Sequence, residues 1–185
     1  MNDANPPGGA ALLVVDVQPT FLRVMPHGEA CLRRCRLAVG AARLLGLPIF
    51  FTEQVPAKLG PTHPDLLAAA GEGARVFAKT AFSALAAPGL ADALRAAGVA
   101  HLLVAGLEGP VCVHQTAVAA LRVDLGVTLL ADAITERRPE DGAVCQAAWR
   151  QAGAAVLPVE TVFYALLGDA QKPRFRAFTE LVKQA

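Results

Sequence analysis

Aromatic residues are scarce in this chain of 185 residues: one Trp, one Tyr and eight Phe make up only 5% of it, although 54% is hydrophobic. The core must therefore be built from Ala, Leu and Val, which favours helices packed closely on a sheet over an aromatic-rich sandwich. An excess of one charge is also missing. The formal net charge is +1 with both signs interspersed, unlike the basic patch of a nucleic-acid-binding protein. No apolar run approaches the roughly 18 residues of a membrane span.

A leader-like start and a metal-binding cysteine pattern are lacking too. Residues 1–10 are rich in Asn, Pro and Gly and lack the basic start and apolar core of a signal peptide. We expect them to form a short disordered lead-in to one domain, residues 11–185, in the cytoplasm. Of four cysteines, only Cys31 and Cys35 lie close together. No second close pair accompanies them, so a zinc framework is not expected, and the default for each is a free thiol.

Apolar runs alternate with segments whose apolar residues recur at helical spacing. Strands are predicted at 11–17, 48–52, 75–79, 101–106, 127–131 and 154–157. Helices are predicted at 29–45, 65–70, 87–98, 112–125, 139–151, 161–167 and 173–183. This alternation predicts βαβ units and a parallel sheet covered by helices on both faces. Because no linker or internal repeat interrupts it, the fold class is α/β with a single domain.

Polar residues stand where several of these strands end. They are Asp16, residues 52–54, Lys79, residues 108–112 and Asp132. Ligands of parallel α/β sheets bind outside the carboxyl ends of the strands. We therefore expect these residues to gather along one edge of the sheet and to form an active site.

Cys112 follows a buried strand and a Gly-containing turn, and Pro110 suits the opening of a helix there. A thiol at a helix N-terminus, near an ammonium such as that of Lys79, is favoured as thiolate. If Asp16 joins them, its carboxylate can accept the thiol proton and later return it to a leaving nitrogen. Backbone N–H groups in the turn would stabilise the oxyanion.

Three segments in this order resemble the isochorismatase-like cysteine hydrolases: 13–18 (Leu-Val-Val-Asp-Val-Gln), 77–83 (Phe-Ala-Lys-Thr-Ala-Phe-Ser) and 106–113 (Gly-Leu-Glu-Gly-Pro-Val-Cys-Val). Segments 52–62 and 167–175 are similar to the isochorismatase domain-containing branch of that family. The resemblance implies a three-layer α/β/α Rossmann-like fold with a central, mostly parallel six-stranded sheet. It also implies a catalytic triad of Asp16, Lys79 and Cys112.

The same resemblance implies a cis peptide bond at Leu107–Glu108 and an oxyanion hole made by the N–H groups of Glu108 and Cys112. Members of the family that this sequence resembles are usually homo-oligomers, so a dimer or larger assembly is expected. The residues expected to contact the substrate are Gln18, Phe21, Gln54, Phe82 and Gly109. Gln18, Phe21 and Phe82 are equally compatible with a packing role, and Gln54 with simply ending a strand.

Two departures from the family pattern bear on the substrate. The family commonly has Thr or Ala and then a larger residue where this chain has Gly109-Pro110, which removes a side chain from the pocket. The nicotinamidase branch binds zinc through an Asp-x-His and a further His in the loop after the second strand, whereas that loop contains only His63 here. No metal or other cofactor is therefore expected, nor nicotinamidase activity. The isochorismatase reaction itself is not expected either, because the enzyme for it lacks the nucleophilic Cys.

The leading hypothesis is a hydrolase of a small amide, ureide or related C–N bond, acting through a thioester on Cys112. Taken singly, each triad residue has a plainer interpretation: Asp16 as a turn cap, Lys79 as a solvated charge, Cys112 as a core thiol. A non-catalytic binding protein that keeps the pocket is the first alternative. A redox-responsive Cys112 is the second. Neither a nucleic-acid nor a membrane partner is expected.

Overall fold

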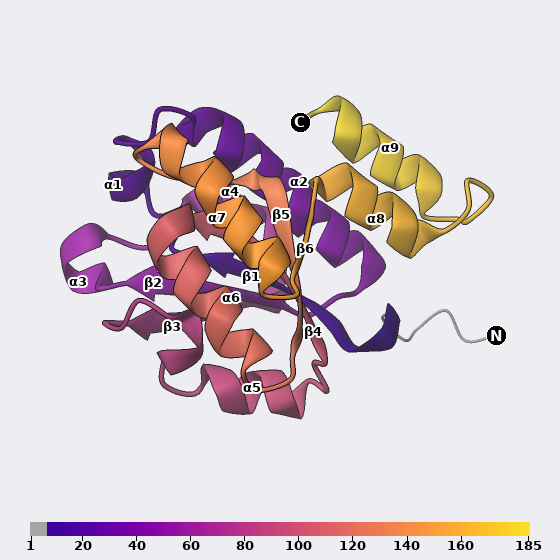
Figure 1. The fold of residues 1–185 in the computed structure, drawn as a ribbon. Helices are drawn as coiled ribbons and strands as arrows, with labels where there is room; N and C mark the ends of the chain where they lie inside the picture. Colours follow the sequence, from indigo (N-terminus) through magenta and orange to yellow (C-terminus); the bar gives the residue numbers. More distant parts are fainter. Residues whose placement is uncertain (1–6) are drawn as a thin grey trace.

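A six-stranded parallel sheet forms the centre of the computed structural model, which describes residues 7–185 (Figure 1). Its strands, in the order β3-β2-β1-β4-β5-β6, are β1 (Ala10–Val15), β2 (Ile49–Gln54), β3 (Ala74–Lys79), β4 (His101–Leu107), β5 (Gly126–Thr135) and β6 (Ala155–Leu157). The helices are α1 (Pro19–Leu22), α2 (Gly28–Leu45), α3 (Pro56–Leu59), α4 (Pro64–Ala70), α5 (Leu90–Ala96), α6 (His114–Leu121), α7 (Pro139–Gln151), α8 (Val159–Leu167) and α9 (Phe175–Lys183). Every neighbouring pair of strands is parallel, so the predicted α/β fold class is confirmed.

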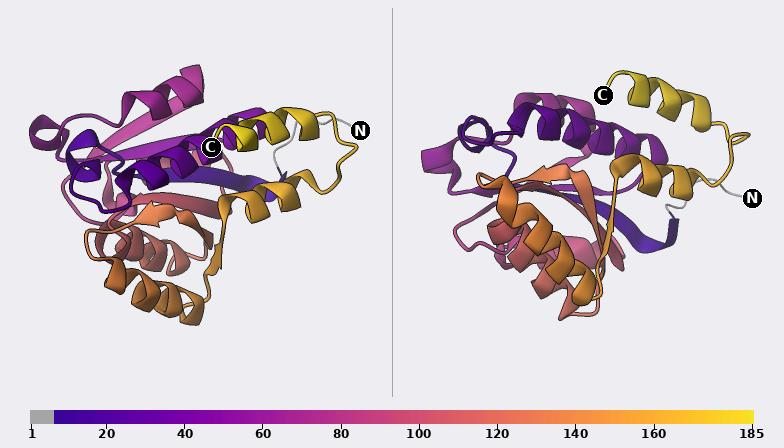
Figure 2. Two further views of the ribbon diagram at one scale, coloured as in Figure 1. Left: turned by 90° about the horizontal axis from the view of Figure 1, so that it is seen from above. Right: turned by 45° about the horizontal axis from the view of Figure 1, so that its top comes forward.

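Two layers of helices enclose the sheet (Figure 2). Helices α2, α4, α8 and α9 contribute to the core on one face, and α5, α6 and α7 to the core on the other. Strand β1 is buried along its whole length. Because side chains alternate along a strand, Leu12 and Val14 enter the first core while Leu13 and Val15 enter the second. This two-sided burial explains why β1 is a continuous apolar run.

The strand order reverses direction between β1 and β4, and Gly106 lies at that junction. Val15 of β1 stands opposite Gly106 on one side and Thr52 of β2 on the other. Gly106 has a φ of 134°, and a methyl group on its Cα would overlap the backbone of Val15. Only glycine combines this backbone angle with so close an approach. Ligands bind in the crevice at such a reversal, so the fold itself indicates the space between the ends of β1 and β4.

The structure corrects several predicted boundaries. Strand β5 continues to Thr135 instead of ending before Asp132, and its pairing with β4 shifts register between Val104 and Gly106. The position of such a bulge depends on the pairing with the neighbouring strand. The sequence of β5 alone therefore did not predict where this strand ends. Helices α5 and α6 are shorter than predicted, and the short α1 and α3 lie in segments for which no helix was predicted.

Part of the predicted disordered lead-in, residues 1–6, lies outside the described residues. In the rest of the predicted lead-in, Pro7–Gly9 form a short 3-10 turn and β1 already begins at Ala10. Among the helices of residues 7–185, none is both long and apolar enough to cross a bilayer.

Candidate active site

The ends of β1, β2, β3 and β4 meet at one edge of the sheet, on the side where α1 and α3 lie (Figure 1). Asp16 directly follows β1, while Gln54 and Lys79 are the last residues of β2 and β3 and stand opposite each other. Glu108 directly follows β4 and opens the turn that carries Cys112. The predicted convergence of Asp16, Lys79 and Cys112 is therefore present.

Asp16 is held by three polar contacts although it is 1% exposed. Its Oδ2 accepts a hydrogen bond from Lys79 Nζ at 2.7 Å, and its Oδ1 accepts one from the Thr52 hydroxyl at 2.8 Å. Its N–H donates to the Thr52 carbonyl at 3.1 Å. The residue has a φ of +56°, which is unusual for a residue other than glycine. This backbone turn directs a carboxylate from the strand end into the site, as strained residues at functional sites often do.

Lys79 is 3% exposed, and several acceptors surround its ammonium group. Besides Asp16, Nζ donates to Gln54 Oε1 at 2.6 Å, to the Phe82 carbonyl at 3.0 Å and to the Ala81 carbonyl at 3.2 Å. A buried charge is tolerated only when it is paired and hydrogen-bonded. These hydrogen bonds therefore hold the Lys79 side chain in a single position, unlike a solvated surface lysine.

Cys112 Sγ lies 3.7 Å from Lys79 Nζ, close enough for the ammonium to stabilise a thiolate. Burial is the largest effect on the thiol, however, and the carboxylate of Asp16 adds to it. Together they outweigh Lys79 and raise the pKa of Cys112 to about 12. The expectation of a resting thiolate is thus wrong, because desolvation disfavours the charged form. The site holds a thiol beside the carboxyl group of Asp16, a candidate acceptor of its proton.

Cys112 lies within a π-helical segment, Gly109–Val113, that directly precedes α6. Glu108 has φ 57° and ψ 71°, and its carbonyl accepts the N–H groups of Val111 at 2.9 Å and Val113 at 3.2 Å. The expected cis bond at Leu107–Glu108 is not found, since every peptide bond of residues 7–185 is trans. The left-handed conformation of Glu108 reverses the chain instead.

Thr116, near the start of α6, stabilises the segment that carries Cys112 through two hydrogen bonds. Its hydroxyl donates to the Cys112 carbonyl at 2.6 Å and accepts the N–H of Ala84 at 2.8 Å. It links the segment after β3 to the segment after β4. Sequence reasoning missed it, because a threonine inside a helix carries no signal of its distant partner.

Of the residues predicted to contact the substrate, Gln18 and Gln54 are buried and bonded to the protein. Gln18 Nε2 donates to the carbonyls of Gly60 at 2.6 Å and Gln54 at 3.1 Å, while its Oε1 accepts the Gln54 N–H at 2.8 Å. Gln54 in turn donates to the Thr80 carbonyl at 2.8 Å and accepts from Lys79. Both glutamines therefore position the loops and the ammonium around the site.

The other predicted contacts differ in exposure. Phe21 is half-buried and packs against the core on the α2 face. Phe82 is 52% exposed beside the site, and its carbonyl bonds Lys79. Gly109 is buried in the turn that carries Cys112.

Asp132 does not reach this site, although the sequence placed it at a strand end. Its carboxylate pairs with Arg34 of α2 at 2.7 Å and accepts the N–H of Val159 at 2.8 Å. It thus joins α2, β5 and the start of α8. The residues that follow β5 are Glu136 and Arg137, which sequence reasoning missed because the bulge moves the strand end.

Arg137 forms an ion pair with the carboxylate of Glu108, whose side chain is 9% exposed against 62% for Arg137. Glu136 lies against Gly109, in the turn that carries Cys112, and against Gly142 of α7. Burial, with the carboxylates of Glu108 and Asp141, raises the pKa of Glu136. Acidic side chains therefore lie against the turn that carries Cys112.

The loop after β2 is anchored by Glu53 and His63. Glu53 Oε1 accepts the Thr62 N–H at 2.7 Å and its hydroxyl at 2.9 Å, and His63 Nδ1 accepts the N–H of Asp65 at the start of α4 at 3.3 Å. Both side chains have structural partners. In the described part of the chain, no group of three or more His, Cys, Asp or Glu side chains is arranged so that it could hold a metal ion.

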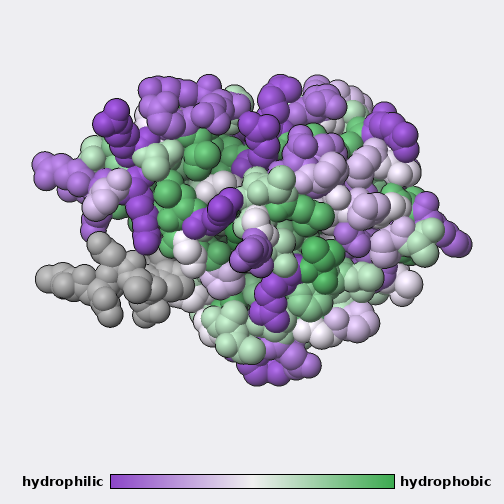
Figure 3. Space-filling model, turned by 180° about the vertical axis from the view of Figure 1, so that it is seen from behind, coloured by the Kyte–Doolittle hydropathy of each residue, from purple (hydrophilic) through white to green (hydrophobic). Residues whose placement is uncertain are grey.

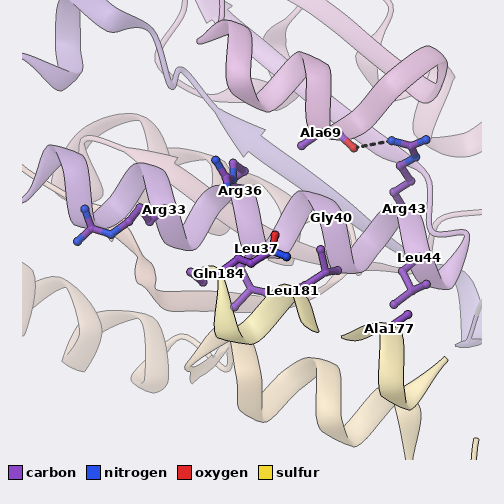
Figure 4. Close-up of a pocket in the computed structure, with 11 residues that line it drawn as sticks. Arg33, Arg36, Leu37, Gly40, Arg43, Leu44, Ala69, Ala177, Leu181 and Gln184 are labelled. Atoms are coloured by element: carbon purple, nitrogen blue, oxygen red, sulfur yellow. Dashed lines mark hydrogen bonds between the residues drawn. The ribbon is translucent and has the colours of Figure 1, made fainter. Parts of the chain in front are cut away.

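A separate groove of about 570 Å³ lies over α2, α4 and α9 (Figure 4). Arg33, Arg36 and Arg43 follow one another along α2, and Arg43 donates to the Ala69 carbonyl at 3.3 Å. None of the predicted site residues lines it. It is therefore distinct from the Cys112 site.

Comparison with known proteins supports one family. A family model, the isochorismatase domain, matches residues 10–162. Isochorismatase domain-containing protein 2 of Bos taurus is 35% identical over 179 residues, which cover 96% of this chain and 85% of that protein.

Solved structures agree with this match. The MAR1 ribonuclease of Caenorhabditis elegans has a TM-score of 0.91 at 31% identity and covers 98% of this chain and 93% of its own. The Escherichia coli YcaC gene product, an octameric hydrolase of unknown specificity, shares the fold with a TM-score of 0.82 at 22% identity, over 95% and 94% of the two chains. On the match of sequence and fold along nearly its whole length, this chain belongs to the isochorismatase-like hydrolase family.

Proposed function

We propose that this protein is a cysteine hydrolase that cleaves a small amide, ureide or related C–N bond through a thioester on Cys112. The observation that carries the proposal is one ammonium, Lys79 Nζ, placed 2.7 Å from Asp16 Oδ2 and 3.7 Å from Cys112 Sγ. Lys79 thus contacts both the Asp16 carboxylate and the Cys112 sulfur at the strand ends, an arrangement that supports an activated nucleophile.

The first step is transfer of the Cys112 thiol proton to the Asp16 carboxylate as Sγ attacks the carbonyl carbon. With an ionised Asp16 the pKa of Cys112 is about 12, so the thiolate forms only together with this transfer. Once Asp16 is neutral, Lys79 pairs with the sulfur in place of the carboxylate. The N–H groups of Glu108 and Cys112 receive the oxyanion of the tetrahedral intermediate.

In the second step the C–N bond breaks, and protonated Asp16 gives its proton to the leaving nitrogen. The acyl group remains on Cys112 as a thioester. A water molecule then attacks the thioester carbon while Asp16 accepts one of its protons. The C–S bond then breaks, the carboxylic acid leaves, and protonated Asp16 returns its proton to the sulfur, which restores the starting state.

The test is a screen of small amides and ureides for ammonia release, with the intact mass of the protein measured during turnover. We expect an acyl adduct on Cys112 and a loss of at least about a thousandfold in activity in C112A, as for other removed nucleophiles. The C145A variant removes a half-buried thiol outside the triad and is expected to retain activity. Adducts confined to Cys145, or turnover that survives in C112A, would contradict the proposal.

RNA cleavage is a second candidate, because MAR1 of Caenorhabditis elegans is a ribonuclease by name. The Glu136 carboxylate, which lies against Gly109 and has no cationic partner among the described residues, opposes it, since a negative charge repels a phosphate backbone. RNA degradation by the wild-type protein that disappears in C112A would favour this candidate over the amidase.

The binding-protein and redox alternatives predict different outcomes. A thiol whose pKa is about 12 is a poor target for peroxide, so we expect slow oxidation of Cys112. Rapid, reversible oxidation would favour the redox alternative. A ligand that binds tightly near Cys112, without turnover of any amide in the screen, would favour a binding protein.

Assembly and location complete the proposal. Large apolar side chains reach the surface between hydrophilic ones (Figure 3), and Val76 and Phe82, at the β3 edge, are 41% and 52% exposed. A homo-oligomer that covers such residues is expected, as in the octameric YcaC, and light scattering after size exclusion tests it. The free cysteines favour a reducing compartment such as the cytoplasm.

A further inference from the structure

Glu136 lies in a slot between two glycines from different elements. A methyl group on Gly109, in the catalytic turn, would lie only 2.6 Å from Glu136 Oε2, and one on Gly142, in the first turns of α7, would overlap Oε1. The carboxylate thus occupies the space that two side chains would otherwise fill. This slot places a charge directly against the turn that carries Cys112.

The carboxylate of Glu136 is unpaired among the residues that the structure describes. The arginines next to it are paired elsewhere: Arg137 with Glu108, and Arg138 with Glu140 at 3.2 Å and Asp141 at 3.7 Å. No described donor offsets the effects of burial and of Glu108 and Asp141, which raise the pKa of Glu136. A half-buried, unpaired carboxylate of this kind gains stability from a cationic partner.

We infer that Glu136 is a specificity-determining residue that binds a cationic nitrogen group of the substrate, an ammonium, amidinium or guanidinium, beside the bond attacked by Cys112. This deepens the proposed function, on which it rests, by naming the class of substrate. A carboxylate binds such N–H groups through short, charge-assisted hydrogen bonds, two at once for an amidinium or guanidinium. A neutral substrate leaves the carboxylate without a partner, and an anionic one is repelled.

The test measures the charge preference of Cys112 itself and requires no turnover. Three methanethiosulfonate reagents of similar size carry an aminoethyl, a propyl or a sulfonatoethyl group, and each forms a mixed disulfide with the attacking sulfur as methanesulfinate leaves. The rates are measured at Cys112 by peptide mass in a C145S background, because Cys145 on α7 also lies near Glu136. The ratio of the aminoethyl rate to the propyl rate cancels the intrinsic reactivity of the thiol.

In the wild-type site we expect the cation to react about tenfold faster than the neutral reagent, and the anion more slowly. E136Q is expected to lower the ratio about three- to tenfold, the effect of one partly screened charge. The neutral rate should change by less than about twofold. E140Q is the matched control, since Glu140 is an exposed acid of the same segment, and its ratio should equal that of wild type. An unchanged ratio in E136Q, or an equal drop in E140Q, would overturn the inference.

G142A moves the same carboxylate without removing its charge or altering the catalytic turn. Because Gly142 is inside a helix, alanine is well accepted there, and its methyl group displaces Glu136. The ratio is expected to fall as in E136Q, and a wild-type ratio in G142A would show that the slot does not direct the charge. The proposed hydrolysis can fail separately: an absent acyl adduct on Cys112 would contradict it while leaving the charge preference measurable.

Discussion

The two sides of the catalytic edge differ in how completely their charges are paired. At the ends of β1 and β3, the side chains of Asp16 and Lys79 are 1% and 0% exposed, and each has several hydrogen-bond partners. Beyond β4 and β5, Glu108 is paired with a largely exposed arginine, Arg137, and Glu136 with none that is described. The first side fixes the groups to which the proposed mechanism assigns proton transfer. The second leaves charge free for recognition.

We call the Asp16–Lys79 region the paired side and the Glu108–Glu136 region the open side. The largest effect is expected from removing a charge on the paired side. K79M leaves the buried carboxylate of Asp16 without its cation, so we expect the free energy of unfolding to fall by about 3–5 kcal/mol and hydrolysis to be lost. The double variant D16N/K79M removes both charges and should regain most of the stability but none of the activity. Urea denaturation of the wild type and both variants measures the unfolding free energies. A double variant less stable than K79M would contradict the pairing argument.

The next effect concerns the thiol that faces this pair. Because the pKa of Cys112 is raised to about 12, its alkylation by iodoacetamide should quicken about tenfold per pH unit from pH 7 to 10, without a plateau. The Asp16 carboxylate contributes to raising that pKa, so D16N should bring the plateau to lower pH. Stopped-flow or mass-resolved alkylation measures the profile. A wild-type plateau below about pH 8 would show a resting thiolate instead.

A smaller effect is expected where the two sides are joined. T116V removes the acceptor of the Ala84 N–H and the donor to the Cys112 carbonyl, both buried. We expect a loss of about 1–3 kcal/mol in unfolding free energy, the cost of unsatisfied buried groups. T116S keeps the hydroxyl and should retain most of the stability. If T116S is destabilised as much as T116V although it keeps the hydroxyl, the two hydrogen bonds would not account for the loss.

The smallest change in stability is expected on the open side. Arg137 is 62% exposed, so R137Q should alter unfolding free energy by less than about 1 kcal/mol. It frees the Glu108 carboxylate beside the oxyanion site, however, and we expect hydrolysis to fall about three- to tenfold. R138Q is the control, because Arg138 is 71% exposed and pairs with residues of its own segment. A stability loss in R137Q like that of K79M would erase the contrast between the sides.

The paired side could be predicted from sequence, since its signals are local. Each of Asp16 and Lys79 ends an apolar run, and parallel strands bring such ends together. Helix α7 was predicted with the bounds found, residues 139–151, and α2 ends at Leu45 as predicted. These features depend on short-range pattern and on the chemistry of single residues.

The open side could not be predicted in the same way. The bulge in β5 depends on pairing with β4, and it moved the strand end from Asp132 to Thr135. That shift hid Glu136 and Arg137, and it assigned Asp132 to a site it does not reach. The protonation of Cys112 also escaped the sequence, because burial, which exceeds the effect of Lys79, follows from packing and not from spacing.

The ammonium of Lys79 has more neighbours than protons. Five acceptors surround Nζ, namely Asp16, Gln54, the carbonyls of Ala81 and Phe82, and Cys112, whereas an ammonium carries three protons. Rotation about the Cε–Nζ bond alone can therefore turn a proton from the carboxylate to the sulfur. When negative charge passes from Asp16 to Cys112, its counter-ion follows without any displacement of the nitrogen. A rigid, buried side chain can thus serve the proposed proton transfer by rotation of its ammonium group alone.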